Sequence, residues 1–191
     1  MQATRLIVGI GGAIGPNSTS ERIMGLVLDN AAARGWRVAK FGGPLLADIP
    51  HYDPASPPTA RAVDLVAAVR DADAILIATP SYHGGVSGLV KNALDTLQAL
   101  SVDRRPYLDG RVVGCVVTAG GPQACGTTLS GLRDVIHALR GWPTPASVTV
   151  TSATPCFDPI TKSPLARLED QIDVLSRHLL SFVQAQPTEP L

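Results

Sequence analysis

The sequence feature that most constrains the fold is an apolar run that ends in a glycine-rich loop and continues as a helix. Residues 73–78 are almost continuously apolar, which is typical of a strand buried on both faces. Pro80 is expected to end the strand, because proline cannot donate to a sheet ladder. Apolar residues at helical spacing follow from about Ser87 to Leu100. This order places the loop at the carboxyl edge of a parallel sheet, where open α/β sheets bind ligands.

The glycine-rich loop also has a purely structural interpretation, which the residues leave open. Gly84 and Gly85 can supply the positive φ that a tight turn between a strand and a helix needs. A turn of that kind has no use for a ring, yet Tyr82 and His83 stand beside the glycines. We therefore favour a ligand-binding loop over a bare turn.

Strand and helix patterns alternate along the chain. Besides residues 73–78, strand patterns occupy residues 5–10, 36–41, 111–118 and 146–150. Helical spacing of apolar residues occurs in residues 18–34, 62–69, 87–100, 129–139 and 165–182. This alternation predicts a single-domain α/β fold over residues 1–185, a three-layer α/β/α sandwich with a five-stranded parallel sheet in the order 2-1-3-4-5. Residues 42–58 are expected to form a long loop, and residues 186–191 a frayed tail.

Three hydroxyl residues stand where the first predicted helix begins, at Ser18, Thr19 and Ser20. Ser18 and Glu21, three residues apart, match a capping box, and helix capping alone would account for the pattern. Hydroxyls and free backbone N–H groups at a helix start also bind phosphate. The two interpretations are compatible, because a capping hydroxyl can also donate to a ligand.

Composition argues against several classes of function. The 191 residues carry 16 basic and 16 acidic side chains, and the resulting zero net charge argues against nucleic-acid binding and against a strongly acidic electron carrier. No apolar run approaches the length of a membrane span, and residues 1–10 lack the pattern of a secretory signal, so a cytoplasmic location is expected. The three cysteines have neither metal-site nor disulfide spacing. Cys115 is expected to be buried in a strand, and Cys125 to be accessible in a loop.

The motif around the glycine-rich loop resembles one family closely. The residues that match the second flavin loop of the NAD(P)H-dependent FMN reductases are Thr79, Pro80, Tyr82, His83, Gly85, Ser87, Gly88, Lys91 and Asn92. That family has a flavodoxin-like fold. The resemblance extends from about Leu6 to Leu180 and is weakest after Pro155.

The resemblance implies FMN as cofactor and NAD(P)H as hydride donor, with the FMN at the ends of the first, third and fourth predicted strands. The residues that we assign to this site are Gly12, Ser18, Thr19, Ser20, Pro80, Ser81, Tyr82, His83, Gly84, Gly85, Thr118, Gly120 and Gly121. Backbone N–H groups of residues 81–85 and 120–121 would bond the pyrimidine edge of the flavin and stabilise negative charge on its reduced form. No catalytic side chain and no metal are expected, because the cofactor carries the hydride.

The chain departs from the family pattern ahead of the first helix. The family often has a serine and an arginine there, where this chain has Gly12 and Ile14. A positively charged partner for the FMN phosphate is therefore missing from this loop, and Arg22 is the candidate to replace it. This departure predicts weaker FMN binding than in members that keep the arginine.

The resemblance implies an NAD(P)H-dependent FMN reductase whose reduced flavin passes to a partner monooxygenase or to quinone, azo or metal acceptors. A flavodoxin-like electron-transfer protein without enzymatic activity is one alternative, and an α/β protein that binds no flavin is another. No nucleic acid or membrane is expected as a partner. A homodimer or homotetramer is expected, because apolar residues cover more than one face of the helix over residues 87–100 and because family dimers use this helix.

Overall fold

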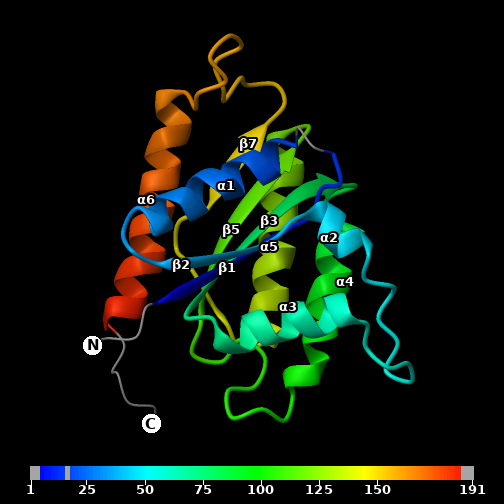
Figure 1. The fold of residues 1–191 in the computed structure, drawn as a ribbon. Coiled ribbons are helices and arrows are strands. Elements are labelled where there is room, and N and C mark those ends of the chain that lie inside the picture. The colour runs from blue at the N-terminus through cyan, green and yellow to red at the C-terminus, as the bar shows by residue number, and fades with distance from the viewer. Residues whose placement is uncertain (1–4, 16–17, 186–191) are drawn as a thin grey trace.

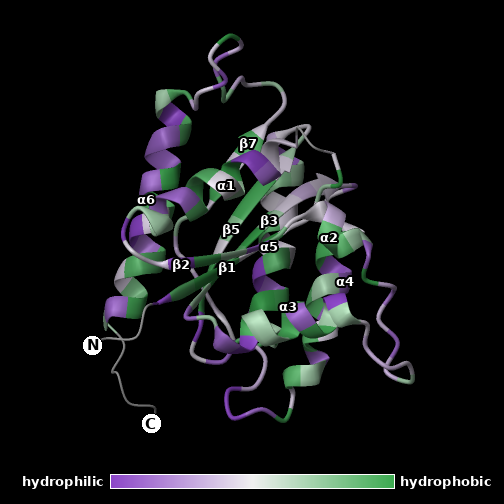
Figure 2. Ribbon diagram, in the orientation of Figure 1, coloured by the Kyte–Doolittle hydropathy of each residue, from purple (hydrophilic) through white to green (hydrophobic). Residues whose placement is uncertain are grey.

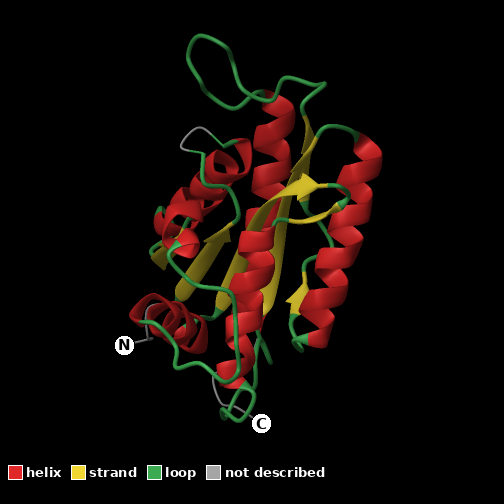
Figure 3. Cartoon of the chain, turned by 90° about the vertical axis from the view of Figure 1, so that its right-hand side faces the viewer, coloured by secondary structure: helices red, strands yellow, loops and turns green. Residues whose placement is uncertain are grey.

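A parallel sheet forms the centre of the molecule, and helices cover both of its faces (Figures 1 and 3). The computed structural model describes residues 5–15 and 18–185. The strands are β1 (Leu6–Gly11), β2 (Arg37–Phe41), β3 (Ala74–Tyr82), β4 (Gly85–Val86), β5 (Val112–Ala119), β6 (Trp142–Pro143) and β7 (Val148–Thr151). The helices are α1 (Thr19–Ala32), α2 (Gly43–Ala47), α3 (Ala60–Asp71), α4 (Gly88–Thr96), η1 (Leu97–Leu100, a 3-10 helix), α5 (Pro122–Ala138) and α6 (Ala166–Ala185).

The sheet has the order β2-β1-β3-β5-β6, with β7 also paired to β5 and with the short β4 antiparallel to β3. This confirms the predicted flavodoxin-like α/β fold, and the order differs only in detail. The predicted fifth strand, residues 146–150, corresponds to β7, beside the end of β5, and the two-residue β6, beside the start of β5, was not predicted. Pro145, which cannot donate to a ladder, lies between β6 and β7.

The alternation of side chains on β3 explains why its sequence is apolar throughout. Ile75 and Ile77 pack on one face of the sheet, in the core shared with α3, α4 and α5. Leu76 and Ala78 pack on the other face, in the core shared with α1 and α6. Figure 2 shows the same result as strongly hydrophobic colouring of the central strands β1, β3 and β5.

Strand β3 is longer than predicted, because it continues through Pro80 to Tyr82. The Gly12 N–H donates to the Ala78 carbonyl (2.8 Å), so Ala78 faces β1. Backbone direction alternates along a strand, and the nitrogen of Pro80 therefore also faces the side of β1, which has already ended at Gly11. The missing N–H of the proline leaves no acceptor unpaired there, so the prediction that Pro80 ends the strand was wrong.

Two other predicted segments differ from the structure. The long loop predicted over residues 42–58 contains the short helix α2, which has proline in its first turn. The apolar side chains on α4 and η1 that were taken to indicate a subunit interface are almost all buried within the chain, and only Leu89 is partly exposed. Those residues therefore give no support for a dimer. The predicted tail, residues 186–191, lies outside the described residues.

Candidate cofactor site

A cavity of about 530 Å³ lies at the carboxyl ends of β3, β5 and β7, beside the start of α1. We call it the cofactor cavity. Its lining residues are Thr19, Pro80, Ser81, Thr118, Ala119, Gly120, Val150, Thr151, Ser152, Thr154, Pro155, Cys156 and Phe157. Five of the predicted site residues are thus brought together: Thr19, Pro80, Ser81, Thr118 and Gly120.

The start of α1 presents its hydroxyl residues in different ways. Thr19 lines the cofactor cavity. Ser20 is completely buried, and its Oγ lies 2.9 Å from the Oγ of the half-buried Ser18, so it fixes that hydroxyl. Ile14, which stands where the family often has arginine, is 61% exposed and does not line the cavity.

The predicted capping box at Ser18 does not form. The Ser18 side chain makes no cap hydrogen bond, and the Glu21 carboxylate accepts from the Gly43 N–H at the start of α2 (3.1 Å). Lys40 lies 3.5 Å from the same carboxylate. Glu21 is engaged with these two donors, and among the described residues no side chain caps the first N–H groups of α1. Such groups are the ones that bind anionic ligands at helix starts.

Gly12 has a packing role next to the cavity. A Cβ at this position would lie 2.4 Å from Ser87 Oγ and 2.6 Å from Val90 Cγ2, so only glycine lets the end of β1 approach the start of α4. Its N–H is already bonded to Ala78. Gly12 thus shapes the site without lining the cofactor cavity.

The second loop is a β-hairpin between β3 and β4. His83 and Gly84 form its two-residue turn and both have positive φ (52° and 78°), the signature of a type I′ turn. Tyr82 and His83 are exposed, and neither they nor Gly84 and Gly85 line the cofactor cavity. Sequence reasoning read these residues as a strand-to-helix loop and missed the hairpin.

Ser81 joins the end of β3 to α5. Its Oγ accepts from Thr128 Oγ1 (2.7 Å) and lies 3.4 Å from the Ala124 carbonyl. Thr79 has a comparable internal role, because its Oγ1 accepts from the Ser87 N–H (2.9 Å). These bonds hold the end of β3 in a fixed relation to α5 and to the start of α4.

The third loop runs from β5 into α5, and there is open space beside its two glycines. A Cβ added at Gly120 or Gly121 would meet nothing within 4 Å, so crowding does not require glycine at either position. Helix α5 begins at Pro122, about seven residues before the predicted helix, because proline is well suited to the first helical turn. Cys125 is therefore buried in this helix, and the prediction that it is accessible in a loop was wrong.

Residues 152–165, between β7 and α6, form the remaining wall, and we call them the 152–165 loop. Phe157 and Cys156 of this loop line the cofactor cavity. The Arg22 guanidinium lies 3.6 Å from the centre of the Phe157 ring and donates to the Lys162 carbonyl (2.8 Å). Arg22 is thus engaged with this loop, and the prediction that it replaces the missing phosphate partner is not supported. Sequence reasoning missed the loop, and its only signal was its place after the last strand.

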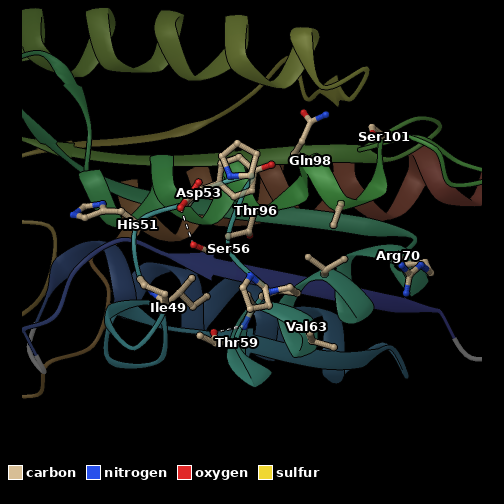
Figure 4. A pocket seen from close by; sticks show the side chains of 18 residues that line it. Ile49, His51, Asp53, Ser56, Thr59, Val63, Arg70, Thr96, Gln98 and Ser101 are labelled. Carbon is tan, nitrogen blue, oxygen red and sulfur yellow. Dashed lines mark hydrogen bonds between the residues drawn. The ribbon is translucent and has the colours of Figure 1, made fainter.

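The residues Lys91 and Asn92 of the family-like motif lie outside the cofactor cavity. The Asn92 side chain accepts from the Tyr52 N–H (2.8 Å) and donates to the carbonyls of Ile49 (3.2 Å) and Pro50 (3.0 Å). It thereby fastens residues 49–52 to α4. These residues border a second cavity of about 440 Å³, between residues 49–59, α3 and η1 (Figure 4).

Several polar groups of this second cavity already have hydrogen-bond partners. Ser56 donates to Asp53 (2.7 Å), and this hydrogen bond and one from the Ala55 N–H lower the pKa of Asp53 (Figure 4). Arg70 pairs with Asp103 (2.6 Å). Exposed apolar side chains, among them Tyr52 and Val63, complete the lining.

The chemistry of the cofactor cavity is that of a binding site. Of the described residues that line it, none carries a charge, and hydroxyl and backbone groups supply its polarity. Over residues 5–15 and 18–185, no group of histidine, cysteine and acidic side chains could hold a metal ion. No helix in the described part of the chain combines the length and apolarity of a membrane span. The cavity suits a polar molecule that brings its own reactivity.

Solved structures share this fold at low sequence identity. An NADH:FMN oxidoreductase in its apo form has a TM-score of 0.73 and 23% identity, over 98% of this chain and 92% of that one. An oxidoreductase from Corynebacterium diphtheriae has a TM-score of 0.73 and 20% identity, over 96% of this chain and 99% of that one. The fold is that of a flavodoxin-like α/β protein, and the cavity is a candidate ligand site at the carboxyl edge of its sheet.

The sequence pattern of the NADPH-dependent FMN reductases matches residues 6–155. The chain therefore belongs to the NADPH-dependent FMN reductase family. An FMN-dependent NADPH-azoreductase from Staphylococcus haemolyticus is 29% identical over 127 residues, which is 64% of this chain and 63% of that protein. One from Staphylococcus aureus is 34% identical over 85 residues, 44% of this chain and 42% of that protein. The matches thus span less than two thirds of these relatives.

Proposed function

We propose that this chain is an enzyme that binds FMN in the cofactor cavity and transfers hydride to it from NAD(P)H. The observation that carries the proposal is the cavity of about 530 Å³ at which the start of α1 and the ends of β3, β5 and β7 meet. Its uncharged lining of hydroxyl and backbone groups fits a cofactor that needs binding and orientation more than acid or base catalysis. Membership of the FMN reductase family supports the same cofactor.

The residues around the cavity divide into two groups for this role. Ser18 and Thr19, with the uncapped N–H groups of α1, would hold the phosphate. Ser81, Thr118 and the backbone at Gly120 would surround the ring and its ribityl chain. FMN, once bound, supplies the two-electron chemistry. The protein supplies donors that stabilise the reduced form and a wall at the 152–165 loop that excludes water.

We propose quinones, azo compounds or metal ions as electron acceptors, or a monooxygenase that receives reduced flavin. The relatives that are named FMN-dependent NADPH-azoreductases support an azo or quinone acceptor. A single open face would serve NAD(P)H first and the acceptor second. Ping-pong kinetics are then expected if FMN stays bound, and sequential kinetics if it leaves as product.

We propose that the protein is cytoplasmic, which the three free cysteines support. We also propose a homodimer, or a homotetramer built from it. The support for assembly comes from the second cavity, where Tyr52 and Val63 leave apolar surface exposed among prolines. Light scattering at micromolar concentration tests this, and a monomeric mass would reject it.

The test of the function uses the purified protein with added FMN. After gel filtration we expect flavin absorbance to travel with the protein, and we expect it to bleach when NADH or NADPH is added without oxygen. Flavin that binds but is not reduced by either nucleotide would indicate an electron-transfer protein instead. Protein that neither binds FMN nor oxidises NAD(P)H in its presence would overturn the proposal.

A further inference from the structure

Several side chains with a hydroxyl group line the cofactor cavity, and Ser81 differs from the others in how it is held. These side chains are Thr19, Ser81, Thr118, Thr151, Ser152 and Thr154. Within residues 5–15 and 18–185, Ser81 is the only one of them whose hydroxyl accepts a hydrogen bond from another side chain. The donor is Thr128 Oγ1, at 2.7 Å. A second residue thus orients this one hydroxyl of the lining.

Thr128 lies on α5 and does not line the cofactor cavity itself. It is only 1% exposed, and a buried hydroxyl needs a partner because an unpaired polar group in the interior costs free energy. Among the described residues, Ser81 is the partner that the Thr128 hydroxyl has. The hydroxyl of Thr128 is therefore committed to Ser81.

The hydrogen of the Ser81 hydroxyl remains free to donate. A serine hydroxyl has one hydrogen to donate and can accept two hydrogen bonds, and the bond from Thr128 uses only its accepting capacity. The acceptor that the described residues offer is the Ala124 carbonyl, 3.4 Å away. That distance exceeds the range of about 2.5–3.0 Å that is usual for O–H···O bonds. The hydrogen is thus left for a molecule in the cavity that Ser81 lines.

Thr79, two residues earlier on β3, shows the opposite arrangement. Its Oγ1 donates to the Pro80 carbonyl (2.8 Å) and accepts from the Ser87 N–H (2.9 Å). The one hydrogen of this hydroxyl is therefore used within the chain, and Thr79 does not line the cofactor cavity. Of these two hydroxyls at the end of β3, only that of Ser81 has both access to the cavity and a hydrogen to offer.

We propose that Thr128 is a positioning residue for the cofactor: it orients the Ser81 hydroxyl so that Ser81 donates a hydrogen bond to FMN. A donor that is already oriented loses less freedom when the ligand binds. The bond from Thr128 also polarises the Ser81 hydroxyl and makes it a stronger donor. Thr128 acts only through Ser81. This assignment rests on the proposed function.

The test measures the Kd for FMN by fluorescence titration of the purified protein. Ser81→Ala should raise the Kd about three- to tenfold, since one neutral hydrogen bond to the cofactor is lost. Thr128→Val, which removes the orienting hydroxyl and keeps nearly the same shape, should raise it about threefold. Thr128→Ser keeps the hydroxyl and should restore the Kd of the wild type.

Thr144→Val is the matched control for the loss of a buried threonine hydroxyl. Thr144 is 2% exposed, and its hydroxyl donates to the Ala146 carbonyl (2.8 Å). It directly follows β6, which pairs with the start of β5, and so lies at the sheet edge opposite the cofactor cavity. Its replacement should lower stability to urea and leave the Kd for FMN unchanged.

The double variant Ser81→Ala/Thr128→Val separates positioning from a general loosening of the fold. Because Thr128 acts through Ser81, this variant should bind FMN as Ser81→Ala does. The proposal would be overturned if Thr128→Val weakened binding by the same factor with and without Ser81. An unchanged Kd in Thr128→Val, or a Thr128→Ser variant that binds as weakly as Thr128→Val, would also overturn it.

Two further outcomes remain decisive. An unchanged Kd in Ser81→Ala would overturn the proposal even if Thr128→Val failed to fold, because Ser81 would then give no bond to the cofactor. Wild-type protein that binds no FMN is a different result. It would reject the proposed function, and this assignment with it, before any variant is compared.

Discussion

The Arg22 guanidinium lies over the ring of Phe157, 3.6 Å from its centre, and joins the first helix to a loop more than 130 residues later in the chain. The same guanidinium donates to the Lys162 carbonyl, so one side chain holds the 152–165 loop at two points. Phe157 in turn lines the cofactor cavity. The arginine that the sequence suggested as a phosphate partner therefore acts on the wall of the cavity.

Loss of this contact should loosen the wall. Arg22→Gln removes a stacked cation, a contact that contributes about 0.5–2 kcal/mol, and should raise the Kd for FMN about three- to tenfold. Fluorescence titration of FMN measures the Kd, and limited proteolysis should show faster cleavage within residues 158–163. Arg34→Gln, at an exposed site just after α1, is the control and should change neither. An unchanged Kd in Arg22→Gln would show that the wall does not depend on the contact.

Two glycines of the proposed site should respond differently to alanine. In Gly12→Ala the new methyl group would meet Ser87 and Val90, so the free energy of unfolding should fall by about 1–3 kcal/mol. In Gly120→Ala the methyl group meets nothing within 4 Å, so unfolding by urea should be nearly unchanged while FMN binding weakens. Equal stability losses in the two variants would contradict this assignment.

The hydroxyls at the start of α1 should contribute to FMN binding as a pair. Replacing both Ser18 and Ser20 by alanine removes the bonded hydroxyls beside the uncapped N–H groups and should weaken FMN binding by about 1–3 kcal/mol. Titration with riboflavin, which lacks the phosphate, is the control and should give the same Kd for the wild type and the double variant. Equal losses for both flavins would place these hydroxyls away from the phosphate.

The neighbours Asn92 and Lys91 should differ in their effect on stability. Asn92→Ala leaves the N–H of Tyr52 and the carbonyls of Ile49 and Pro50 without their partner, which should cost about 1–3 kcal/mol and speed hydrogen exchange in residues 49–56. Lys91→Ala breaks only an exposed ion pair with Asp95 and should cost less than about 1 kcal/mol. The reverse ranking would mean that Asn92 does not fasten the loop.

The thiol of Cys115 should be inert in the folded protein. Burial raises its pKa to about 12, so at pH 9 only about one molecule in a thousand carries the reactive thiolate. The unfolded chain loses this proton near the ordinary pKa of 9, so the folded state holds the extra proton between pH 9 and 12. The free energy of unfolding should therefore fall as the pH rises through that window, and Cys115→Ala should reduce the slope. Rapid modification of Cys115 in native protein would contradict the burial.

Local patterns were sufficient to predict the five longer strands, but not β4 or β6, and to predict the edge of the sheet at which the cavity lies. Continuous apolar runs identify doubly covered strands such as β3, and their carboxyl ends must meet. Contacts between distant residues were not predictable. The bonding of Glu21 to Gly43 and the buried position of Arg111, which donates to carbonyls including those of Ala72 and Tyr107, depend on how separate segments pack. The hairpin at His83 was missed because a glycine pair after a strand fits several kinds of turn, and the two consecutive positive φ angles are visible only in the structure.

The residues that line the cofactor cavity are far apart in the sequence, and this has a consequence for folding during protein synthesis. Thr19 comes from the first tenth or so of the chain, whereas Val150 and Phe157 come from its last quarter. A chain still emerging from the ribosome can form the central strands and their first helices long before these residues meet. FMN should therefore bind only after β7 and the 152–165 loop have docked. The appearance of bound flavin during synthesis would then report the moment at which the fold is complete.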